Sequence, residues 1–583
     1  KKDRYMLSAS LNYKILDWLT VSGRVSLDNA NNDYTEKFYA STNTQLTEGS
    51  SRGLYGITKT SDKQLYADFL VSINKNFGED WNLSANIGGS FTDVRSDLMT
   101  VRGGIADGSD AFPGEQVGLT NYFAIQNLSQ KARRLQEGWR EQTQSIYASA
   151  ELGYKSTYYL TLTGRNDWPS QLAGPNSTSK SFFYPSVGLS VVLSELMPNL
   201  NKDYLSYLKL RGSFASVGSA FQRYLANPRY EWSTSANQWS VLTQYPMYSL
   251  KPERTNSFEI GFNARFLKYF ELDATYYNAK TENQTFNPQL PINKYSKMYI
   301  QTGSVRNQGI ELALNFENTW RNFTWMSGLT YSMNKNKIES LADNVINPIT
   351  GQLFSIPSLD MGGYADLRFI LREGGSMGDL YSRTDLRRDA NGAIYMDESN
   401  NVYTQKIDNP DSYIKLGSVL PKGNLAWRNN FMWKNFHVGF MISARLGGVV
   451  FSRTQAILDK FGVSEASADA RDNGFVLING NDRVNPENWY TTVGSTAVPQ
   501  YYTYSATNVR LQEASIGYTI PRKWLANVCD IKVSLIGRNL WMIYNKAPFD
   551  PEAVASTDNF YQGIDNFMMP SLRNVGFSLN FKF

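Results

Sequence analysis

The chain ends on Arg573–Phe583, with the sequence RNVGFSLNFKF. From Val575 onward apolar residues occupy every second position: Val575, Phe577, Leu579, Phe581 and Phe583 stand against Asn574, Gly576, Ser578, Asn580 and Lys582. Side chains alternate between the two faces of a β-strand, so this stretch predicts a strand with one apolar and one polar face. The same alternation recurs along the chain, for example in 146–154, 258–266 and 310–317.

Composition limits how such strands can meet a membrane. The 583 residues are 42% hydrophobic with a mean hydropathy of -0.41, and no run of about eighteen apolar residues occurs, which excludes a membrane-spanning helix. A membrane barrel is not excluded, because its strands are apolar on one face only. Aromatic residues make up 14% of the chain, and Tyr and Trp favour membrane–water boundaries. A Tyr-rich secreted β-protein would share this composition, so both classes stay open.

The connections between the strands alternate between short and long. Short joins are predicted at Lys14–Trp18, Asn76–Asp80, Lys155–Thr157, Leu267–Tyr269, Glu317–Arg321 and Lys434–Asn435, with two longer ones at Glu195–Tyr204 and Ile520–Asp530. Long joins are predicted at Asn29–Ser61, Asp97–Glu141, Ala215–Glu253, Asn336–Lys422, Val450–Ala506 and Ile543–Pro570. A sandwich or a solenoid has no reason to gather its long loops at one end. A transmembrane barrel has tight turns on one side of the membrane and long loops on the other.

We predict an all-β transmembrane antiparallel barrel with about seventeen strands in this sequence. That is too many for side chains to fill the interior, so the polar face should surround a wet or plugged lumen and the apolar face should meet lipid. At a lipid-facing position near mid-membrane each charged residue would cost roughly 2–4 kcal/mol, so the charged residues of the strands should line the lumen. These residues are Arg165, Lys209, Arg211, Glu259, Arg265, Glu311, Lys532 and Arg538.

Strand direction predicts that part of the barrel lies outside this sequence. The first strand precedes a short turn and the last strand follows a long loop, so both should run toward the short-turn side. Single-chain bacterial barrels have an even number of strands, so an odd number is expected upstream of Lys1. The chain opens on Lys1-Lys2-Asp3-Arg4 and leads straight into a strand, which is typical of a mature or truncated sequence.

The longest connection, Asn336–Lys422, contains several turn-forming stretches, including Gly374-Gly375 and Asp389–Gly392. A structureless loop of this length is unusual, so we expect it to fold on itself or to dock on something. Asp389–Gly392, with Asp397 and Glu398 downstream, partly resembles a calcium loop. The full ligand spacing fails, and a plain turn is the favoured interpretation.

The reactive side chains argue against catalysis. One cysteine, Cys529, and one histidine, His437, allow no internal disulfide, no Cys-rich zinc site and no evident Ser-His-Asp or Cys-His arrangement. Carboxylates are plentiful, but nothing concentrates a pair in a rigid cleft as a glycosidase requires. The net charge is +5, from 58 basic and 53 acidic residues, and no basic stripe favours nucleic acid. We therefore predict neither an enzyme nor a cofactor or metal site.

Motifs distributed in order over most of the chain carry a family resemblance. They are 159–168 (YLTLTGRNDW), 183–187 (FYPSV), 208–213 (LKLRGS), 250–256 (LKPERTN), 303–311 (GSVRNQGIE), 433–436 (WKNF), 509–511 (VRL), 517–521 (GYTIP), 537–540 (GRNL) and 549–552 (FDPE). With them the chain resembles the C-terminal part of a SusC-like TonB-dependent outer-membrane transporter. The final residue, Phe583, resembles the C-terminal aromatic residue that the outer-membrane assembly machinery recognises. Residues 373–381 (EGGSMGDLY) differ from the Gly-Pro-Gly-Tyr-rich sequence that is usual in the family.

The resemblance implies more than the residues themselves indicate. It implies a barrel of about 22 strands, of which residues 1–583 would supply the C-terminal part, with a plug domain and a TonB-contacting segment upstream. It also implies the outer membrane of a Gram-negative bacterium, a SusD-like lipoprotein lid, the TonB complex as partner and a dimer of transporter–lid pairs. The cargo would be an oligosaccharide or an oligopeptide. A passive porin-like or structural outer-membrane barrel is the alternative.

Four loop aromatics are candidates for ligand contact. Trp232, Trp239, Trp489 and Tyr490 fall in predicted long loops with Asn and Gln residues nearby. Flat rings beside amide groups suit sugar rings or extended peptides. Packing of one loop on another, or contact with a lipoprotein lid, is the simpler interpretation for any single one of them.

Overall fold

The computed structural model describes residues 1–107, 118–175, 177–226, 228–233, 236, 238–240, 250–286, 299–346, 351–494, 498–558 and 561–583. The chain forms two compact units. Unit 1 comprises Lys1–Leu189, Phe214–Asn256 and Thr285–Gln301, and unit 2 comprises Ser190–Ser213, Ser257–Gln284 and Thr302–Phe583.

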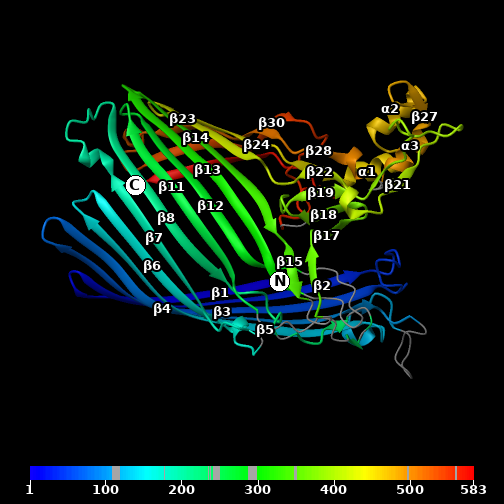
Figure 1. Cartoon of the computed structure of the whole chain (residues 1–583), viewed down its shortest axis with the longest axis horizontal. Coiled ribbons are helices and arrows are strands. Elements are labelled where there is room, and N and C mark those ends of the chain that lie inside the picture. The colour runs from blue at the N-terminus through cyan, green and yellow to red at the C-terminus, as the bar shows by residue number, and fades with distance from the viewer. Residues whose placement is uncertain are drawn as a thin grey trace. The chain divides into compact units, whose positions relative to one another are not determined.

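A 17-stranded sheet is the main element of the described residues. Its strands are β1 (Lys2–Leu16), β2 (Leu19–Phe38), β3 (Leu54–Phe77), β4 (Trp81–Gly104), β5 (Arg133–Tyr154), β6 (Tyr158–Pro169), β7 (Phe182–Val192), β8 (Leu205–Ser219), β11 (Glu253–Phe266), β12 (Phe270–Phe286), β13 (Ile300–Trp320), β14 (Phe323–Ser340), β23 (Gly423–Trp433), β24 (Phe436–Leu446), β29 (Asn508–Ile520), β30 (Asp530–Asn545) and β32 (Asn574–Lys582). Consecutive strands from β1 to β6 pair antiparallel, and they can be followed from blue to cyan in Figure 1. The predicted antiparallel all-β fold is confirmed.

No helix in the described part of the chain has the length and the apolar character needed to cross a membrane.

The predicted short joins are confirmed. They are residues 17–18, 78–80, 155–157, 267–269, 321–322 and 434–435, and the two longer ones contain the 3-10 helices η4 (Leu193–Leu196) and η7 (Arg522–Trp524). Lys155 and Ser156 both have a φ of 52°, and the amide of Thr157 donates to the carbonyl of Tyr154 at 3.0 Å. Two left-handed residues in succession give a turn whose twist matches that of the flanking strands, which explains how so short a join closes.

The predicted bounds of two long joins are wrong. Instead of joins at Asn29–Ser61 and Asp97–Glu141, the strands pair until Phe38 lies opposite Leu54 and Arg102 lies opposite Arg133. Among the described residues, the connections that remain are 39–53, 105–107 and 118–132. From 58 to 64 β3 carries only polar side chains, so no hydrophobic alternation marks it in the sequence. The ladder of main-chain hydrogen bonds continues there without an apolar face.

In unit 1 the register sorts the side chains of β3, β4 and β5 into two faces, because directly paired residues point to the same side of a sheet. The apolar face carries Phe77, Ile73, Val71, Phe69 and Leu65 of β3, paired across the sheet with Trp81, Ala85, Ile87, Gly89 and Asp93 of β4. On β5 it continues with Tyr154, Leu152, Ala150, Ala148 and Ile146. The polar face carries Asn74, Ser72 and Asp68, with Ser84, Asn86 and Ser90 opposite.

Unit 2 repeats this separation across β13, β14, β23, β24 and β29. One row of paired residues is polar: Glu311, Ser332, Asn424, Arg445 and Asn508. The adjacent row is mostly apolar: Leu312, Tyr331, Leu425, Ala444 and Val509. The last strand, β32, agrees with the prediction from its sequence, since Phe577 is 77% exposed on the apolar face. In both units, large apolar side chains are therefore exposed on one face of the sheet.

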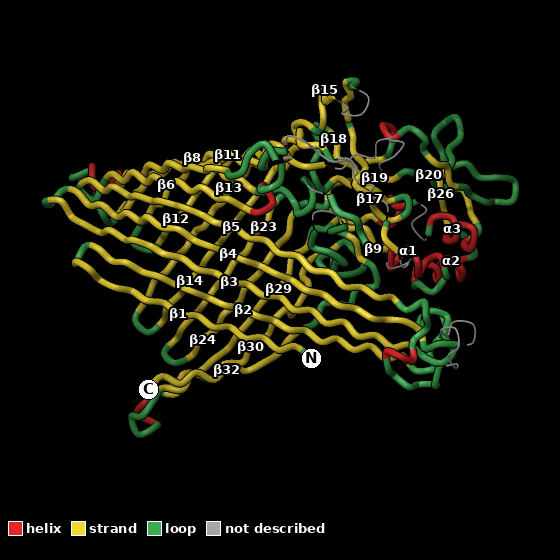
Figure 2. Tube along the Cα trace, turned by 90° about the horizontal axis from the view of Figure 1, so that it is seen from below, coloured by secondary structure: helices red, strands yellow, loops and turns green. Residues whose placement is uncertain are grey.

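The described residues of the connections that follow β14, β24 and β30 fold into a structure that we call the cap. It contains the strands β15 (Ala342–Ile346), β16 (Leu353–Ile356), β17 (Ser358–Tyr364), β18 (Leu367–Arg372), β19 (Asp379–Ser382), β20 (Thr384–Leu386), β21 (Thr404–Lys406), β22 (Ile414–Ser418), β25 (Val449–Ser452), β26 (Val476–Ile478), β27 (Asp482–Val484), β28 (Thr503–Ser505) and β31 (Ile564–Asp565). Three helices, α1 (Arg453–Lys460), α2 (Glu465–Asn473) and α3 (Pro486–Val493), lie together beside β20, β21, β26 and β27 (Figures 1 and 2). In unit 1, β9 (Trp232–Ser233) and β10 (Gln238–Trp239) form a small hairpin.

Local sequence signals begin and end the cap helices. The hydroxyl of Ser452 accepts a hydrogen bond from the amide of Gln455 at the start of α1, and Ser464 does the same for Ser467 in α2. Such capping satisfies amides that have no partner within the helix. Gly474 ends α2 with a φ of 77°, which glycine adopts without a steric penalty.

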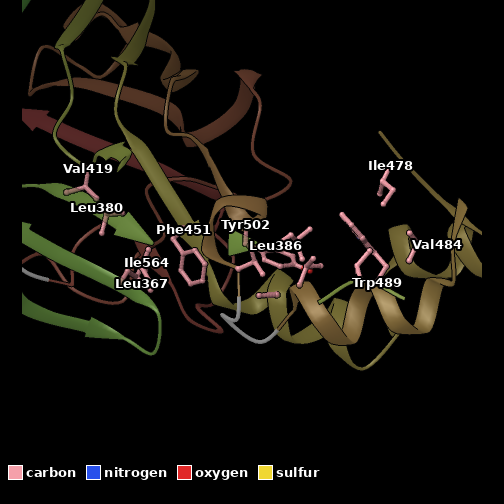
Figure 3. Packing of buried hydrophobic residues seen from close by; sticks show 14 of the residues in the cluster. Leu367, Leu380, Leu386, Val419, Phe451, Ile478, Val484, Trp489, Tyr502 and Ile564 are labelled. Carbon is pink, nitrogen blue, oxygen red and sulfur yellow. The ribbon is translucent and has the colours of Figure 1, made fainter. Parts of the chain in front are cut away.

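One hydrophobic core holds the cap together (Figure 3). Leu367, Phe369 and Leu380 come from the connection after β14, Phe451 from the one after β24, and Ile564 from the one after β30. The first four are fully buried, and Ile564 is 5% exposed. The prediction that Asn336–Lys422 folds on itself is therefore confirmed, and its core includes segments from two further connections.

We expect Phe369→Ala to destabilise the cap by about 3–5 kcal/mol, because Phe369 is fully buried and its removal leaves a cavity. Limited proteolysis of the purified protein in detergent would measure this as faster cleavage within 357–418. Phe461→Ala is the matched control, since Phe461 is 70% exposed. Equal cleavage rates for the two variants would contradict the assignment of Phe369 to the core.

Candidate functional site

A cavity of about 710 Å³, lined by both polar and apolar residues, opens on the polar face of unit 2. Strands β12, β13, β14, β23, β24 and β29 contribute to its wall, together with Arg211 of β8 and Glu552 of the cap. Register brings Glu311, Ser332 and Asn424 side by side, although they lie far apart in the sequence. The wall combines cations, carboxylates, hydroxyls and amides, which suits a ligand with several separate polar groups.

Arg211 of β8 is fixed in this wall by a carboxylate of β12, on the far side of β11. Its two terminal nitrogens donate to Oδ1 and Oδ2 of Asp273 at 2.7 Å and 3.0 Å, and one also donates to Oγ1 of Thr275 at 2.6 Å. A bidentate pair of this kind sets the plane of the guanidinium group. Both side chains are 39% exposed, so they remain accessible from the cavity.

A more deeply buried ion pair ties β29 to the cap next to this cavity. One terminal nitrogen of Arg510 donates to Oδ1 of Asp550 at 2.8 Å and the other donates to Oδ2 at 3.2 Å. The side chains of Arg510 and Asp550 are only 6% and 11% exposed. Glu552 lies 3.3 Å from Arg510, and the hydroxyl of Ser571 also donates to Asp550. The motifs 509–511 and 549–552, which are far apart in the sequence, therefore meet in one cluster.

The surroundings of Asp550 act in opposite directions on its pKa. Burial alone would raise the pKa of this carboxyl, but hydrogen bonds from Arg510, Ser571 and the amide of Glu552 outweigh it and hold the pKa below its ordinary value of 3.8. Removing one partner of a buried pair leaves an uncompensated charge and costs about 3–5 kcal/mol. The cluster thus stabilises the attachment of the cap only while Asp550 is ionised.

We expect the stability contributed by this pair to be lost in acid. Because the pKa of Asp550 is lowered on folding, its contribution is present above the unfolded value of 3.8 and disappears as the pH falls through the lower folded value. Thermal unfolding of the purified protein should be measured between pH 7 and pH 3. The unfolding temperature of the native chain should fall more steeply with pH than that of Asp550→Asn, which is already destabilised at pH 7.

Asp97→Asn is the control for that measurement. Asp97 accepts from Arg95 at 2.8 Å, but both side chains are more than half exposed. Exposed pairs contribute little, so this variant should unfold like the native protein at pH 7. If Asp550→Asn also matched the native protein at pH 7, the role assigned to the buried pair would be wrong.

Four of the eight predicted lumen residues, including Arg211, form ion pairs on the strands. Arg165 lies 2.7 Å from Asp167, Arg265 lies 3.6 Å from Glu271, and Arg538 lies 3.2 Å from Glu513. Only Arg211 and Glu311 of the predicted set line the cavity of unit 2. The remaining members are Lys209, Glu259 and Lys532.

The four aromatic candidates occupy different settings. In unit 1 the rings of Trp232 and Trp239 meet edge to face at 5.3 Å, and Trp239 is 66% exposed. In unit 2, Trp489 is 9% exposed within the cap core, with its ring edge to face with Tyr501 at 5.3 Å. Tyr490 packs against the same core, and its hydroxyl donates to the carbonyl of Ala466 at 3.0 Å. Ligand binding by any of the four stays a prediction.

The cavity is also lined by Asn424, Ser443 and Arg445, which were not predicted from the sequence. The polar alternation at Asn424 and at Ser443 and Arg445 is a signal that could have marked them as members of the polar face. Their place beside Glu311 could not have been found in this way, because it depends on which strands are neighbours.

The remaining candidates are structural. The carboxylate of Asp389 accepts hydrogen bonds from the amides of Asn391 and Ala393, which is the geometry of a turn, and its interpretation as a plain turn stays a prediction. Among the described residues no group of three or more His, Cys, Asp or Glu side chains is placed to hold a metal ion. Nε2 of His437 lies 2.9 Å from the hydroxyl of Thr519, and Cys529 is a buried free thiol.

Residues 1–540 match the family model described as the β-barrel of TonB-dependent receptor-like proteins. The chain belongs to this family. TonB-dependent receptors P3 and P26 of Formosa agariphila are each 26% identical to it over 554 residues, covering 88% of this chain and 52% of the relative. The chain therefore spans about half the length of the curated relatives that it matches. The family expected from the sequence motifs is confirmed.

Solved structures with the same fold include the RagAB peptide transporter and the RagAB peptide importer in its open-open state. Their TM-scores are 0.74 and 0.73, each with 16% identity, and the match covers all of this chain and 62% and 61% of theirs. At this identity the similarity establishes the fold. Together with the family match, it makes the chain a β-barrel portion of a TonB-dependent receptor.

Proposed function

We propose that the chain forms most of the wall of a TonB-dependent importer in the outer membrane of a Gram-negative bacterium. The observation that carries this proposal is the separation of the sheet into two faces. Large apolar side chains are exposed on one face, while the ion pair of Arg211 with Asp273 and the cavity of unit 2 lie on the other. Facing lipid and an aqueous lumen respectively, these faces satisfy the requirements of a transmembrane barrel.

The dimensions of the apolar face support this placement. In unit 1 it begins at an aromatic row, Phe77, Trp81 and Tyr154, next to the short turns, and it reaches Leu65 on β3. Twelve residues of strand span about 40 Å, which becomes about 30 Å at a tilt of about 40°. That height matches a bilayer core with an aromatic girdle on the side of the tight turns.

The cap supports the proposal of a lipoprotein partner. We propose that the cap and the other long connections lie outside the cell and that a SusD-like lipoprotein closes over them, as two transporter–lid pairs in a dimer. The RagAB importer, which has the same fold, is a precedent for a peptide importer. We also propose that a plug domain and a TonB-contacting segment belong to the whole protein, because the curated relatives are about twice as long as this chain.

We propose an oligopeptide or an oligosaccharide as cargo. The cavity of unit 2 presents Arg211 and Glu311 together with hydroxyl and amide groups, within a volume large enough for a short oligomer. Opposite charges on one wall favour the peptide, whose two termini and side chains carry charges of both signs. An oligosaccharide would use the hydroxyl and amide groups alone.

We expect a strain that lacks the whole gene to lose growth on short peptides, or on an oligosaccharide, as the sole source of the nutrient. Complementation with the full-length gene should restore growth. In a strain without TonB, the same complementation should not restore growth. Unchanged uptake by the deletion strain on both classes of nutrient would contradict the proposal.

A passive porin-like barrel is the alternative function. The polar face supports this alternative, because it would suit an open, water-filled lumen. Conductance of the full-length protein in planar bilayers separates the two. A large steady current indicates a passive pore, whereas a silent barrel indicates a plugged transporter.

We expect Glu311→Gln to weaken uptake of a peptide with a free amino terminus by about tenfold, because one charge-assisted hydrogen bond is lost. Uptake of a labelled peptide into whole cells measures the change. Glu317→Gln is the matched control, since Glu317 lies on the same strand and the same face, six residues nearer the short turn. Equal effects of both substitutions would contradict a binding role for the cavity.

A further inference from the structure

Three cations stand side by side on the apolar face of unit 1. Lys63 of β3 pairs directly with Arg95 of β4, and Arg95 pairs directly with Arg140 of β5. We call Lys63, Arg95 and Arg140 the basic row. All three residues are exposed. Like charges directly opposite each other destabilise a sheet, so such a row calls for an explanation.

The basic row lies where the apolar face ends. On β3 the face runs through Val71, Phe69 and Leu65, and Lys63 is the next residue on that side. Fourteen residues separate Lys63 from Phe77 in the aromatic row, which is about 46 Å along the strand and about 35 Å at a tilt of about 40°. A bilayer with its headgroups is about 40–45 Å thick, so the basic row falls at the headgroup level opposite the short turns.

Two carboxylates hold the guanidinium groups in place without cancelling the charge. Arg140 donates to Asp93 at 2.9 Å and Arg95 donates to Asp97 at 2.8 Å, and both aspartates belong to β4. The two arginine side chains remain 64% and 60% exposed. Three cations against two carboxylates leave a net positive charge, and the oriented guanidinium groups can still donate outward to an anion.

We infer that the basic row binds the phosphate groups of a phosphorylated lipid in the outer leaflet. Arginine pairs with phosphate through two parallel hydrogen bonds, and cations at headgroup level attract anionic lipids. The apolar residues directly below, including Phe69 and Ile146 at 53% and 62% exposure, would contact the acyl chains of the same lipid. A soluble phosphate would gain nothing from them, so a lipid is the occupant. This inference rests on the proposed outer-membrane placement.

The test compares two double variants of the full-length protein reconstituted in nanodiscs. Lys63→Gln with Arg95→Gln removes two cations of the basic row. Arg4→Gln with Arg24→Gln removes two arginines from the polar face, where they pair with Asp28 and Asp68. Mass spectrometry then measures how much diphosphorylated lipid A, and how much dephosphorylated lipid A, each protein retains.

We expect the row variant to retain diphosphorylated lipid A about tenfold less than the native protein, and the polar-face variant to retain it unchanged. Retention of dephosphorylated lipid A should be equal in all three proteins. Equal retention of the diphosphorylated lipid by the row variant would overturn the inference, as would equally tight binding of soluble pyrophosphate. Cell fractionation separately tests the membrane placement, so a failure of the proposed function is distinguishable from a failure of the basic row.

Discussion

The pairing of each strand with its neighbours is the constraint on which the rest of this structure depends. Backbone amides and carbonyls inside a membrane must find partners within the protein, and a continuous antiparallel ladder provides them. Once the ladder is in place, residues alternate strictly between two faces, so one register shift would move Phe69 and Ile87 to the side of Asp68 and Asn86. Register therefore decides which side chains meet lipid, which form the polar cavity and which three cations form the basic row.

The cap depends on a different kind of interaction. Its core is hydrophobic, but its attachment to the sheet uses the buried pair of Arg510 and Asp550, with Asn508 and Glu552 beside it. Burying two charges is costly unless geometry and further hydrogen bonds compensate, and here both carboxylate oxygens of Asp550 have partners. Hydrophobic packing is not directional, whereas the hydrogen bonds of this pair fix the position of the cap on β29. The pair also places Glu552 at the edge of the cavity.

Much of the fold was predictable because alternation and turn length are local properties. The strands ending at Phe583 and around Ile146 and Phe258, and the tight turns such as 155–157, follow from residues within a few positions of each other. The polar outer half of β3 was missed, since Lys59–Gln64 shows no alternation although it is paired throughout. For the cavity, the sequence predicted the type of residue but not which residues lie together. Glu311 was identified as a polar-face residue, but Asn424 belongs to a strand that only the pairing of the sheet brings near it.

The composition of the cap core also sets an order of assembly. Phe451 of β25 pairs with Ile564 of β31 in a parallel bridge across 113 residues, and Phe369 joins the same cluster from a third connection. Contacts between such distant segments form late, because the chain between them must first be ordered. Ile564 and Asp550 both follow β30, so the cap can be completed only after every strand of the described sheet except β32 has been synthesised. A chain interrupted before that point would leave the side chains of Phe369 and Phe451 without the part of the core that Ile564 provides.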